Sequence, residues 1–334
     1  MSNDPLLVQL FIYVVVLLSV ATTVVLIIRQ RARAAQNESV TVQNLVARTK
    51  AWWLIVAVMF ASVLIGQKGL FVFYGLLSIL ALREYISVMN TRVADHRTLL
   101  WIFLLVIPVQ YMLAAINWYV MFLIFIPVYC GVLIPARMAL SGDPANFLVR
   151  SSTVQWGVLL CVYFLSHLPM LLHVHFPGLP SGSPRLLFYL VVVSQLSDVF
   201  QYTFGKLFGK TKVSPTISPN KTVEGLILGS LAAVSVGAGL WWITPFPWYG
   251  AAILSLVIVA AGFLGGLVMS AIKRDLGVKD WGTMIAGHGG VLDRIDSLVF
   301  SAPVYFHLVV FYTDAKVEGG PSVLLESILR LQLW

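Results

Sequence analysis

The feature that most constrains this chain is a series of long apolar runs that continues almost to its C-terminus. Most runs are long enough for a helix to cross a bilayer core of roughly 30 Å, which takes about 17–25 residues. We count ten runs, at 6–28, 52–66, 69–82, 99–115, 118–135, 153–173, 186–204, 225–246, 248–272 and 297–312. The runs are continuous rather than alternating, which favours transmembrane helices over a transmembrane β-barrel.

Composition supports the same fold class. Hydrophobic residues make up 59% of the 334 residues and charged residues only 11%, which excludes an ordinary soluble domain. The runs 52–66 and 69–82 are short, and we expect them to form a hairpin that barely spans the bilayer. The prediction is an all-α, polytopic transmembrane bundle of about eight to ten spans.

The basic residues predict how the chain is oriented. Of 22 Lys and Arg residues, 18 fall in five segments between alternate runs. These segments are 29–51, 83–98, 136–152, 205–224 and 273–296. Cytoplasmic loops carry an excess of Lys and Arg, so we expect these segments in the cytoplasm and the N-terminus outside. Ten spans satisfy this pattern without exception.

Three regions follow from this organisation. We expect N-terminal transmembrane helices over 1–185 and a catalytic transmembrane region with cytoplasmic loops over 186–312. An amphipathic tail over 313–334 is expected to lie on the outer surface. The net charge of +8 comes from residues that flank apolar runs, so we assign it to membrane lipids and an anionic substrate, not to nucleic acid.

The first polar segment with unusual residues follows the run 186–204. Ser194, Ser197, Asp198 and Gln201 are spaced i, i+3, i+4 and i+7, so they share one helix face. A polar face inside an apolar helix must face protein, water or a ligand. It therefore indicates either a hydrogen-bond network within the bundle or a substrate or metal face.

The next polar stretch combines two Ser-Pro steps with hydroxyls and a lysine. The Ser-Pro steps fix extended or turn backbone. Ser218, Lys221 and Thr222 then stand just before a predicted helix, where the helix dipole favours an anion such as phosphate. Glu224 either complements that dipole or takes part in the site.

The second polar segment lies between the last two runs. Asp293 and Asp296 are spaced i, i+3 on the predicted final helix, so both carboxylates can reach one Mg²⁺. Arg294 between them could pair with Asp280 or a phosphate. His288 lies in a Gly-His-Gly-Gly turn that permits close approach of a ligand to the backbone.

Together these residues resemble the signature of CDP-diacylglycerol synthases, also called phosphatidate cytidylyltransferases. The resemblance covers roughly 194–300, and the N-terminal half is similar only in being polytopic. Its motif residues run from Asp198 through Ser218, Lys221 and Thr222 to Ser270, Lys273, Arg274, His288, Asp293, Arg294 and Asp296.

The resemblance implies an integral membrane enzyme that condenses CTP with phosphatidic acid, or a related lipid phosphate, to give CDP-diacylglycerol and pyrophosphate. It implies Mg²⁺ held by Asp293 and Asp296 with Asp198. Lys221, Lys273 and Arg274 would neutralise phosphate charge.

Further site residues follow from the same resemblance. Ser218 and Thr222 would donate hydrogen bonds to phosphate, and His288 could donate to a phosphate as well. Ser270 and Arg294 are assigned to binding. We expect the bacterial inner membrane, with the site facing the cytoplasm, and leave a homodimer open.

One departure from the family pattern leaves a second function open. The family usually has Gly-Asp four residues before the signature serine, where this chain has Gly265-Gly266. The missing carboxylate suggests a divergent bacterial paralog, and the alternative is a catalytically impaired protein that binds lipid or regulates. A transporter would show repeat symmetry, which the sequence lacks.

Overall fold

The computed structural model describes residues 5–34, 40–176, 182–284 and 289–313, and these residues are almost entirely helical. His288 and the predicted tail after residue 313 lie outside the described residues. The elements are α1 (Pro5–Ala34), α2 (Val40–Ile65), α3 (Gln67–Ser87), α4 (Val93–Trp101), η1 (Ile102–Val106), α5 (Ile107–Ala115), α6 (Tyr119–Ile124), η2 (Phe125–Cys130), α7 (Gly131–Ala139), α8 (Phe147–Val158), η3 (Leu159–Phe164), α9 (Leu165–Met170), η4 (Leu171–His173), α10 (Arg185–Phe208), β1 (Lys212–Ser214), β2 (Ser218–Thr222), α11 (Val223–Gly239), η5 (Trp241–Ile243), α12 (Trp248–Asp275) and α13 (Leu292–Thr313).

The predicted polytopic helical fold is confirmed. Within the described ranges, nine helical stretches are long and apolar enough to cross a membrane, and three of them join several shorter elements end to end. The run predicted over 225–246 is divided, because α11 ends at Gly239 and a short 3₁₀ turn, η5, follows. Helix α11 has 17 residues, so at 1.5 Å per residue it is about 26 Å long.

The second and third runs differ from the expected short hairpin. Helix α2 begins at Val40 and α3 continues to Ser87, so both helices extend past their apolar runs into polar flanks and are long enough to span. The chain turns between them at Gly66, whose φ of 96° favours glycine. The apolar runs therefore underestimated the helix lengths.

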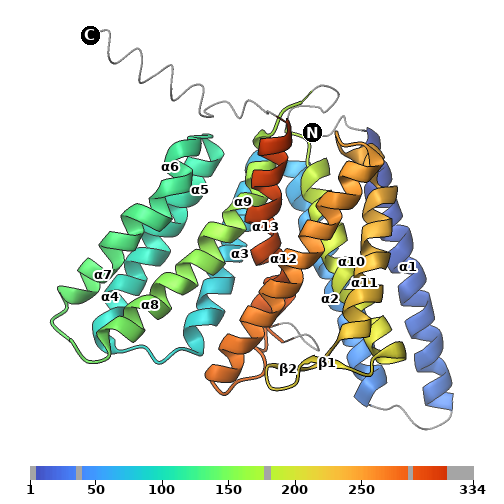
Figure 1. Ribbon diagram of the computed structural model, residues 1–334, viewed down its shortest axis with the longest axis horizontal. Helices are drawn as coiled ribbons and strands as arrows, with labels where there is room; N and C mark the ends of the chain where they lie inside the picture. The colour runs from blue at the N-terminus through green and yellow to red at the C-terminus, as the bar shows by residue number, and fades with distance from the viewer. Residues whose placement is uncertain (1–4, 35–39, 177–181, 285–288, 314–334) are drawn as a thin grey trace.

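The described residues of the five basic segments lie toward one end of the bundle, the lower end in Figure 1. The turns from α3 to α4, from α7 to α8, from α10 to α11 and from α12 to α13 all lie there, together with the lower ends of α1 and α2 (Figure 1). This arrangement agrees with the predicted alternation of the runs. We refer to this end as the lower end.

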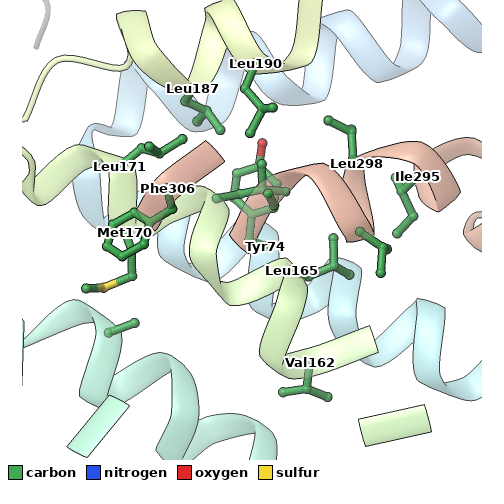
Figure 2. Close-up of a cluster of buried hydrophobic side chains, with 14 of the residues drawn as sticks. Tyr74, Val162, Leu165, Met170, Leu171, Leu187, Leu190, Ile295, Leu298 and Phe306 are labelled. Carbon is green, nitrogen blue, oxygen red and sulfur yellow. The ribbon is translucent and has the colours of Figure 1, made fainter. Parts of the chain in front are cut away.

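A buried apolar core joins the two halves of the chain (Figure 2). Tyr74 of α3 and Leu165 of α9 lie among Leu187 of α10 and Leu298 and Phe306 of α13. All of these side chains are less than one-tenth exposed. Helices α10 and α13 are therefore packed directly on helices of the N-terminal half, and α12 packs on both of them.

A two-stranded hairpin crosses the lower end between α10 and α11 (Figure 1). Strand β1 pairs with β2 in antiparallel fashion, with Lys212 opposite Thr222 and Ser214 opposite Ser218. The extended or turn backbone predicted around the two Ser-Pro steps is confirmed, with a turn over 215–217 between the two strands. The hairpin brings Lys221 to the ends of the surrounding helices.

Candidate active site

Four elements bring the predicted site residues together at the lower end. Asp198 lies on α10, Lys221 on β2, Lys273 near the end of α12, and Asp296 in the first turns of α13. Helix α12 packs against α13, and α10 packs against both, so segments more than a hundred residues apart meet here. The structure thus assembles both polar segments into one region.

Asp293 is engaged on both of its carboxylate oxygens. Lys273 Nζ donates to Asp293 Oδ1 at 2.7 Å, and the two side chains are 11% and 5% exposed. The amides of Trp281 and Gly290 donate to Asp293 Oδ2 at 2.8 and 2.9 Å. Asp293 therefore orients Lys273 and fixes the loop before α13.

Asp198 and Asp296 form a pair of like charges that interact with each other. Asp296 Oδ1 accepts from the Ser297 amide at 2.9 Å. Across the described ranges, neither carboxylate has a cationic side chain within the 4.0 Å of an ion pair. Two acids held together without a close cation leave negative charge for a ligand to neutralise.

Lys221 supplies positive charge near both acids of this pair, and Lys273 acts on Asp296 as well. Burial lowers the pKa of the Lys221 ammonium, and Lys273 lowers it further, while the charges of Asp198 and Asp296 raise it. The ammonium lies over the ring of Phe263, 4.6 Å from its centroid. It is thus held in an apolar setting and faces carboxylates, which strengthens its interaction with any anion that enters.

Gly266 determines where Lys221 can lie. A Cβ added at Gly266 would stand 2.8 Å from Lys221 Nζ, so the ammonium takes space next to the position where the family usually has a carboxylate. The sequence showed only that a carboxylate was missing. The structure shows that a cation adjoins the vacated position.

The polar face predicted on α10 is confirmed as a shared face that points into the protein. Ser194 Oγ donates to Ser297 Oγ at 3.2 Å, and Gln201 Nε2 donates to Ser197 Oγ at 2.9 Å. Ser194 and Ser197 are buried. These hydrogen bonds support the network interpretation for the serines, and Asp198 on the same face interacts electrostatically with Asp296.

Of the residues predicted at the start of α11, Thr222 and Glu224 accept hydrogen bonds from backbone amides, and Ser218 lies in the hairpin. Thr222 is buried as the N-cap of α11, and its Oγ1 accepts from the Gly225 amide at 3.2 Å. Glu224 accepts from the amides of Lys210 and Thr211, at 2.9 Å in the shorter case, and so ties β1 to α11. Ser218 is partly buried and stands opposite Ser214 in the hairpin. Thr222 and Glu224 thus hold the hairpin that presents Lys221.

The remaining predicted residues lie on α12 and α13. Ser270 Oγ donates to the Gly266 carbonyl at 2.6 Å. Arg274 is exposed, and it donates to the carbonyls of Ile217 and Val278 at 3.3 and 3.2 Å, which links the hairpin to the end of α12. Arg294 interacts electrostatically with Asp198.

The residues present fit a single Mg²⁺ with few protein ligands. Among the described residues there is no group of three or more His, Cys, Asp or Glu side chains arranged to hold a metal. Asp293 would have to leave Lys273 to become a ligand. Asp198 and Asp296 remain as a carboxylate pair, and Mg²⁺ commonly takes one or two carboxylates and completes its shell with water and phosphate oxygens.

Sequence reasoning missed Glu84 and Tyr85 of α3, and the loop residue Trp281, through which the loop before α13 is held on α3. Glu84 Oε2 accepts from the Leu292 amide, and Trp281 stacks on Tyr85. One signal was present, because Glu84 is an acid close to a long apolar run, and such residues are usually functional. Nothing local in the sequence shows which segment, some two hundred positions away, it contacts.

Comparison with known proteins identifies the family. A sequence model of the cytidylyltransferase family matches residues 46–312. The uncharacterized protein YnbB of Escherichia coli (strain K12) is 40% identical over 267 residues, which cover 78% of this chain and 86% of that protein.

Two named relatives are enzymes. Phosphatidate cytidylyltransferase of Mycobacterium leprae (strain TN) is 39% identical over 174 residues, 51% of this chain and 53% of the relative. The protein of that name in Staphylococcus aureus (strain COL) is 28% identical over 267 residues, 77% of this chain and 96% of the relative. The chain therefore belongs to the cytidylyltransferase family and is an integral membrane nucleotidyltransferase.

Proposed function

We propose that this enzyme transfers the cytidylyl group of CTP to phosphatidic acid or a related lipid phosphate, in phospholipid biosynthesis. The products are CDP-diacylglycerol and pyrophosphate. The observation that carries the proposal is the electrostatic interaction of the acidic pair Asp198 and Asp296 with Lys221, which lies on the hairpin at the lower end. A lipid phosphate and a soluble nucleotide can meet at that level.

The reaction is an in-line displacement at the α-phosphorus of CTP. A phosphate oxygen of the lipid forms the new P–O bond, and the bond to the β-phosphate bridging oxygen breaks, so that its electron pair leaves with pyrophosphate. Such chemistry depends on positioning and on neutralising charge. Lys221 and Lys273 provide partly buried positive charge for the phosphates, and the exposed Arg274 provides charge at the entrance.

Asp198 and Asp296 are the residues that we assign to Mg²⁺. When bound there, the ion supplies neutralisation of the triphosphate and of the leaving pyrophosphate. To Asp293 we assign the orientation of Lys273, because both of its oxygens are already engaged. Ser218 and His288 stay predicted phosphate donors, and Ser270 and Arg294 stay predicted binding residues.

We place this site on the cytoplasmic side of a bacterial inner membrane, where CTP is available. The support is that 18 of the 22 Lys and Arg residues occur in the five segments at the lower end. The same end carries the acidic pair and Lys221.

Gly266 favours a second candidate function. The position that usually carries a carboxylate is empty, and the Lys221 ammonium lies beside it. A site with one acid fewer and a cation in its place could bind an anionic lipid without transferring a nucleotide. That protein would be a lipid-binding or regulatory paralog.

One assay separates the two functions. Purified protein in detergent is given radiolabelled CTP and phosphatidic acid, with and without Mg²⁺, and CDP-diacylglycerol is measured. We expect Mg²⁺-dependent product from the wild type. If the wild type forms no product and Gly266→Asp does, the result would support the lipid-binding paralog. If neither protein forms product, phosphatidic acid would be rejected as the substrate.

A further inference from the structure

The loop between α12 and α13 is anchored on the N-terminal half of the chain. Its described residues, 276–284 and 289–291, include Trp281, which is fully buried. Helix α3 provides two neighbouring side chains that contact this loop or the residue that follows it, Glu84 and Tyr85.

Glu84 holds the start of α13. Its Oε2 accepts from the Leu292 amide at 2.9 Å, and the residue is only 5% exposed. Leu292 is the first residue of α13, where amides lack partners within the helix and where a negative charge is stabilising. A carboxylate from α3 therefore caps the helix that carries Asp293 and Asp296.

Tyr85 holds the loop through Trp281. The two rings stack with centroids 5.4 Å apart and planes inclined by 29°. The Trp281 amide in turn donates to Asp293 Oδ2 at 2.8 Å, and Asp293 Oδ1 accepts from Lys273. A continuous series of contacts therefore leads from α3 to the ammonium of Lys273.

Two glycines in the loop lie against the Glu84 side chain. A Cβ at Gly282 would stand 3.0 Å from Glu84 Oε1, and its three nearest neighbours would all be Glu84 side-chain atoms. A Cβ at Gly290 would collide with Glu84 Oε2. The loop backbone approaches the carboxylate from two sides because both positions lack a side chain.

We propose that Glu84 is a positioning residue for the site, which acts by fixing loop residues 276–284 and 289–291 and the first turn of α13. It does not touch the reacting atoms. The proposal rests on the proposed function for its kinetic consequence only. The docking of the loop on α3 can be tested separately.

The first test measures the docking directly. Lys279 is exposed in the loop, so trypsin cleavage after Lys279 reports how often the loop leaves α3. We expect Glu84→Ala in detergent to be cut about tenfold faster than wild type, since a buried charged acceptor is lost. Glu84→Gln keeps an acceptor for Leu292 and should be cut within about threefold of the wild-type rate.

A matched control separates docking from general loss of stability. Gln110 is also buried in the N-terminal half, but it bonds to Phe122 and Ser166, away from the loop. Gln110→Leu should lower the unfolding temperature and leave cleavage after Lys279 unchanged. Equal cleavage in Glu84→Ala and Gln110→Leu, at matched stability, would overturn the proposal.

The second test uses Gly282→Ala, whose new methyl group would have side-chain atoms of Glu84 as its three nearest neighbours. We expect this substitution to speed cleavage in the wild-type background by about threefold and to have no effect in Glu84→Ala, where the clash is absent. Additive effects in the double variant would show that the loop does not rest on Glu84, and would overturn the proposal.

The kinetic test connects the loop to the reaction. Glu84→Ala should lower kcat about tenfold while the KM for CTP changes less than about threefold, because Lys273 is misplaced in the transition state. Glu84→Gln should restore most of kcat. If wild type makes no CDP-diacylglycerol, the proposed function fails while the cleavage comparison still decides whether Glu84 docks the loop. An active wild type with unchanged kcat in Glu84→Ala would overturn the positioning role.

Discussion

Two clusters of charged residues lie at the lower end, and they differ in how their charges are matched. In the N-terminal half, Arg150 lies between Asp143 and Asp95, with Nη1 2.7 Å from Asp143 and Nε 3.5 Å from Asp95. Arg92 also pairs with Asp143, at 3.1 Å. We call these four residues the Arg150 cluster.

The second cluster consists of Asp198, Asp296 and Lys221, and we call it the Asp198 cluster. Its charges interact at longer range, and in the described part of the chain none of the three forms an ion pair within 4.0 Å. Every charged side chain of the Arg150 cluster has an ion-pair partner within 4.0 Å, whereas the Asp198 cluster keeps charge that a ligand can match. That difference, rather than the number of charges, separates a structural cluster from a candidate site.

The largest expected effect comes from the Asp198 cluster. Asp296→Asn should lower CDP-diacylglycerol formation by about 10²–10³-fold, because the removed charge acts on the charged reacting phosphates. The unfolding temperature should stay the same or rise, since a repulsion between like charges is removed. Activity is measured with radiolabelled CTP, and unfolding is followed by heating in detergent.

Asp275→Asn is the matched control, because Asp275 is an exposed acid at the end of α12. It should keep wild-type activity. Full activity of Asp296→Asn with unchanged Mg²⁺ dependence would remove the carboxylate pair from the mechanism.

The Arg150 cluster should respond in the opposite way. Arg150→Met leaves the Asp95 carboxylate, only 1% exposed, without its cation, and breaking a buried pair on one side costs about 3 kcal/mol of unfolding free energy. Activity per folded molecule should not change. Denaturant unfolding in mixed micelles measures the loss, and the activity is normalised to the folded fraction.

Lys273→Met sharpens this prediction, because the Lys273–Asp293 pair is comparably buried. It should cost about as much stability and also lower activity per folded molecule. If Arg150→Met reduces activity per folded molecule as strongly, the two clusters are not functionally distinct.

Sequence and structure agree where the determinants are local. Continuous apolar runs require helices, and i, i+3, i+4 spacing places Ser194, Ser197 and Asp198 on one face whatever the tertiary fold. The engagement of Asp293 by Lys273, and of Leu292 by Glu84, depends on how distant helices pack. Spacing within one helix gave no access to those partners, so Asp293 was predicted only as a metal ligand.

A smaller effect is expected from restoring the missing carboxylate. In Gly266→Asp the new side chain meets Lys221 Nζ, so an ion pair should form beside the acidic pair. We expect the Mg²⁺ concentration for half-maximal activity to change by about three- to tenfold, since one charge is added near the ligands. This concentration is measured by titrating the activity with Mg²⁺. Metal binding itself is measured by titrating the protein with Mn²⁺ and following the electron paramagnetic resonance signal.

Gly266→Asn is the control for the added bulk, because it places a side chain of similar size beside Lys221 without the charge. A shift in the Mg²⁺ requirement that is equal in both variants would show that displacement of Lys221, and not a new carboxylate, is responsible. No shift in either variant would separate position 266 from the metal site.

The smallest expected effect tests whether the Arg150 cluster contributes to stability through charge. Hydrogen bonds from Arg150 and from the Ala145 amide hold the pKa of Asp143 below its ordinary value. A depressed carboxyl pKa contributes stability that is present above the unfolded value of about 3.9 and is lost as the pH falls through the folded value. The difference in unfolding temperature between wild type and Asp143→Asn should therefore be largest near neutral pH and should vanish in acid. Because the Asp143 side chain is partly exposed to solvent, added salt should reduce the difference as well. A difference that persists unchanged in acid would mean that Asp143 stabilises the protein through hydrogen bonds that do not need its charge. The Arg150 cluster would then contribute to stability through hydrogen-bond geometry rather than through charge.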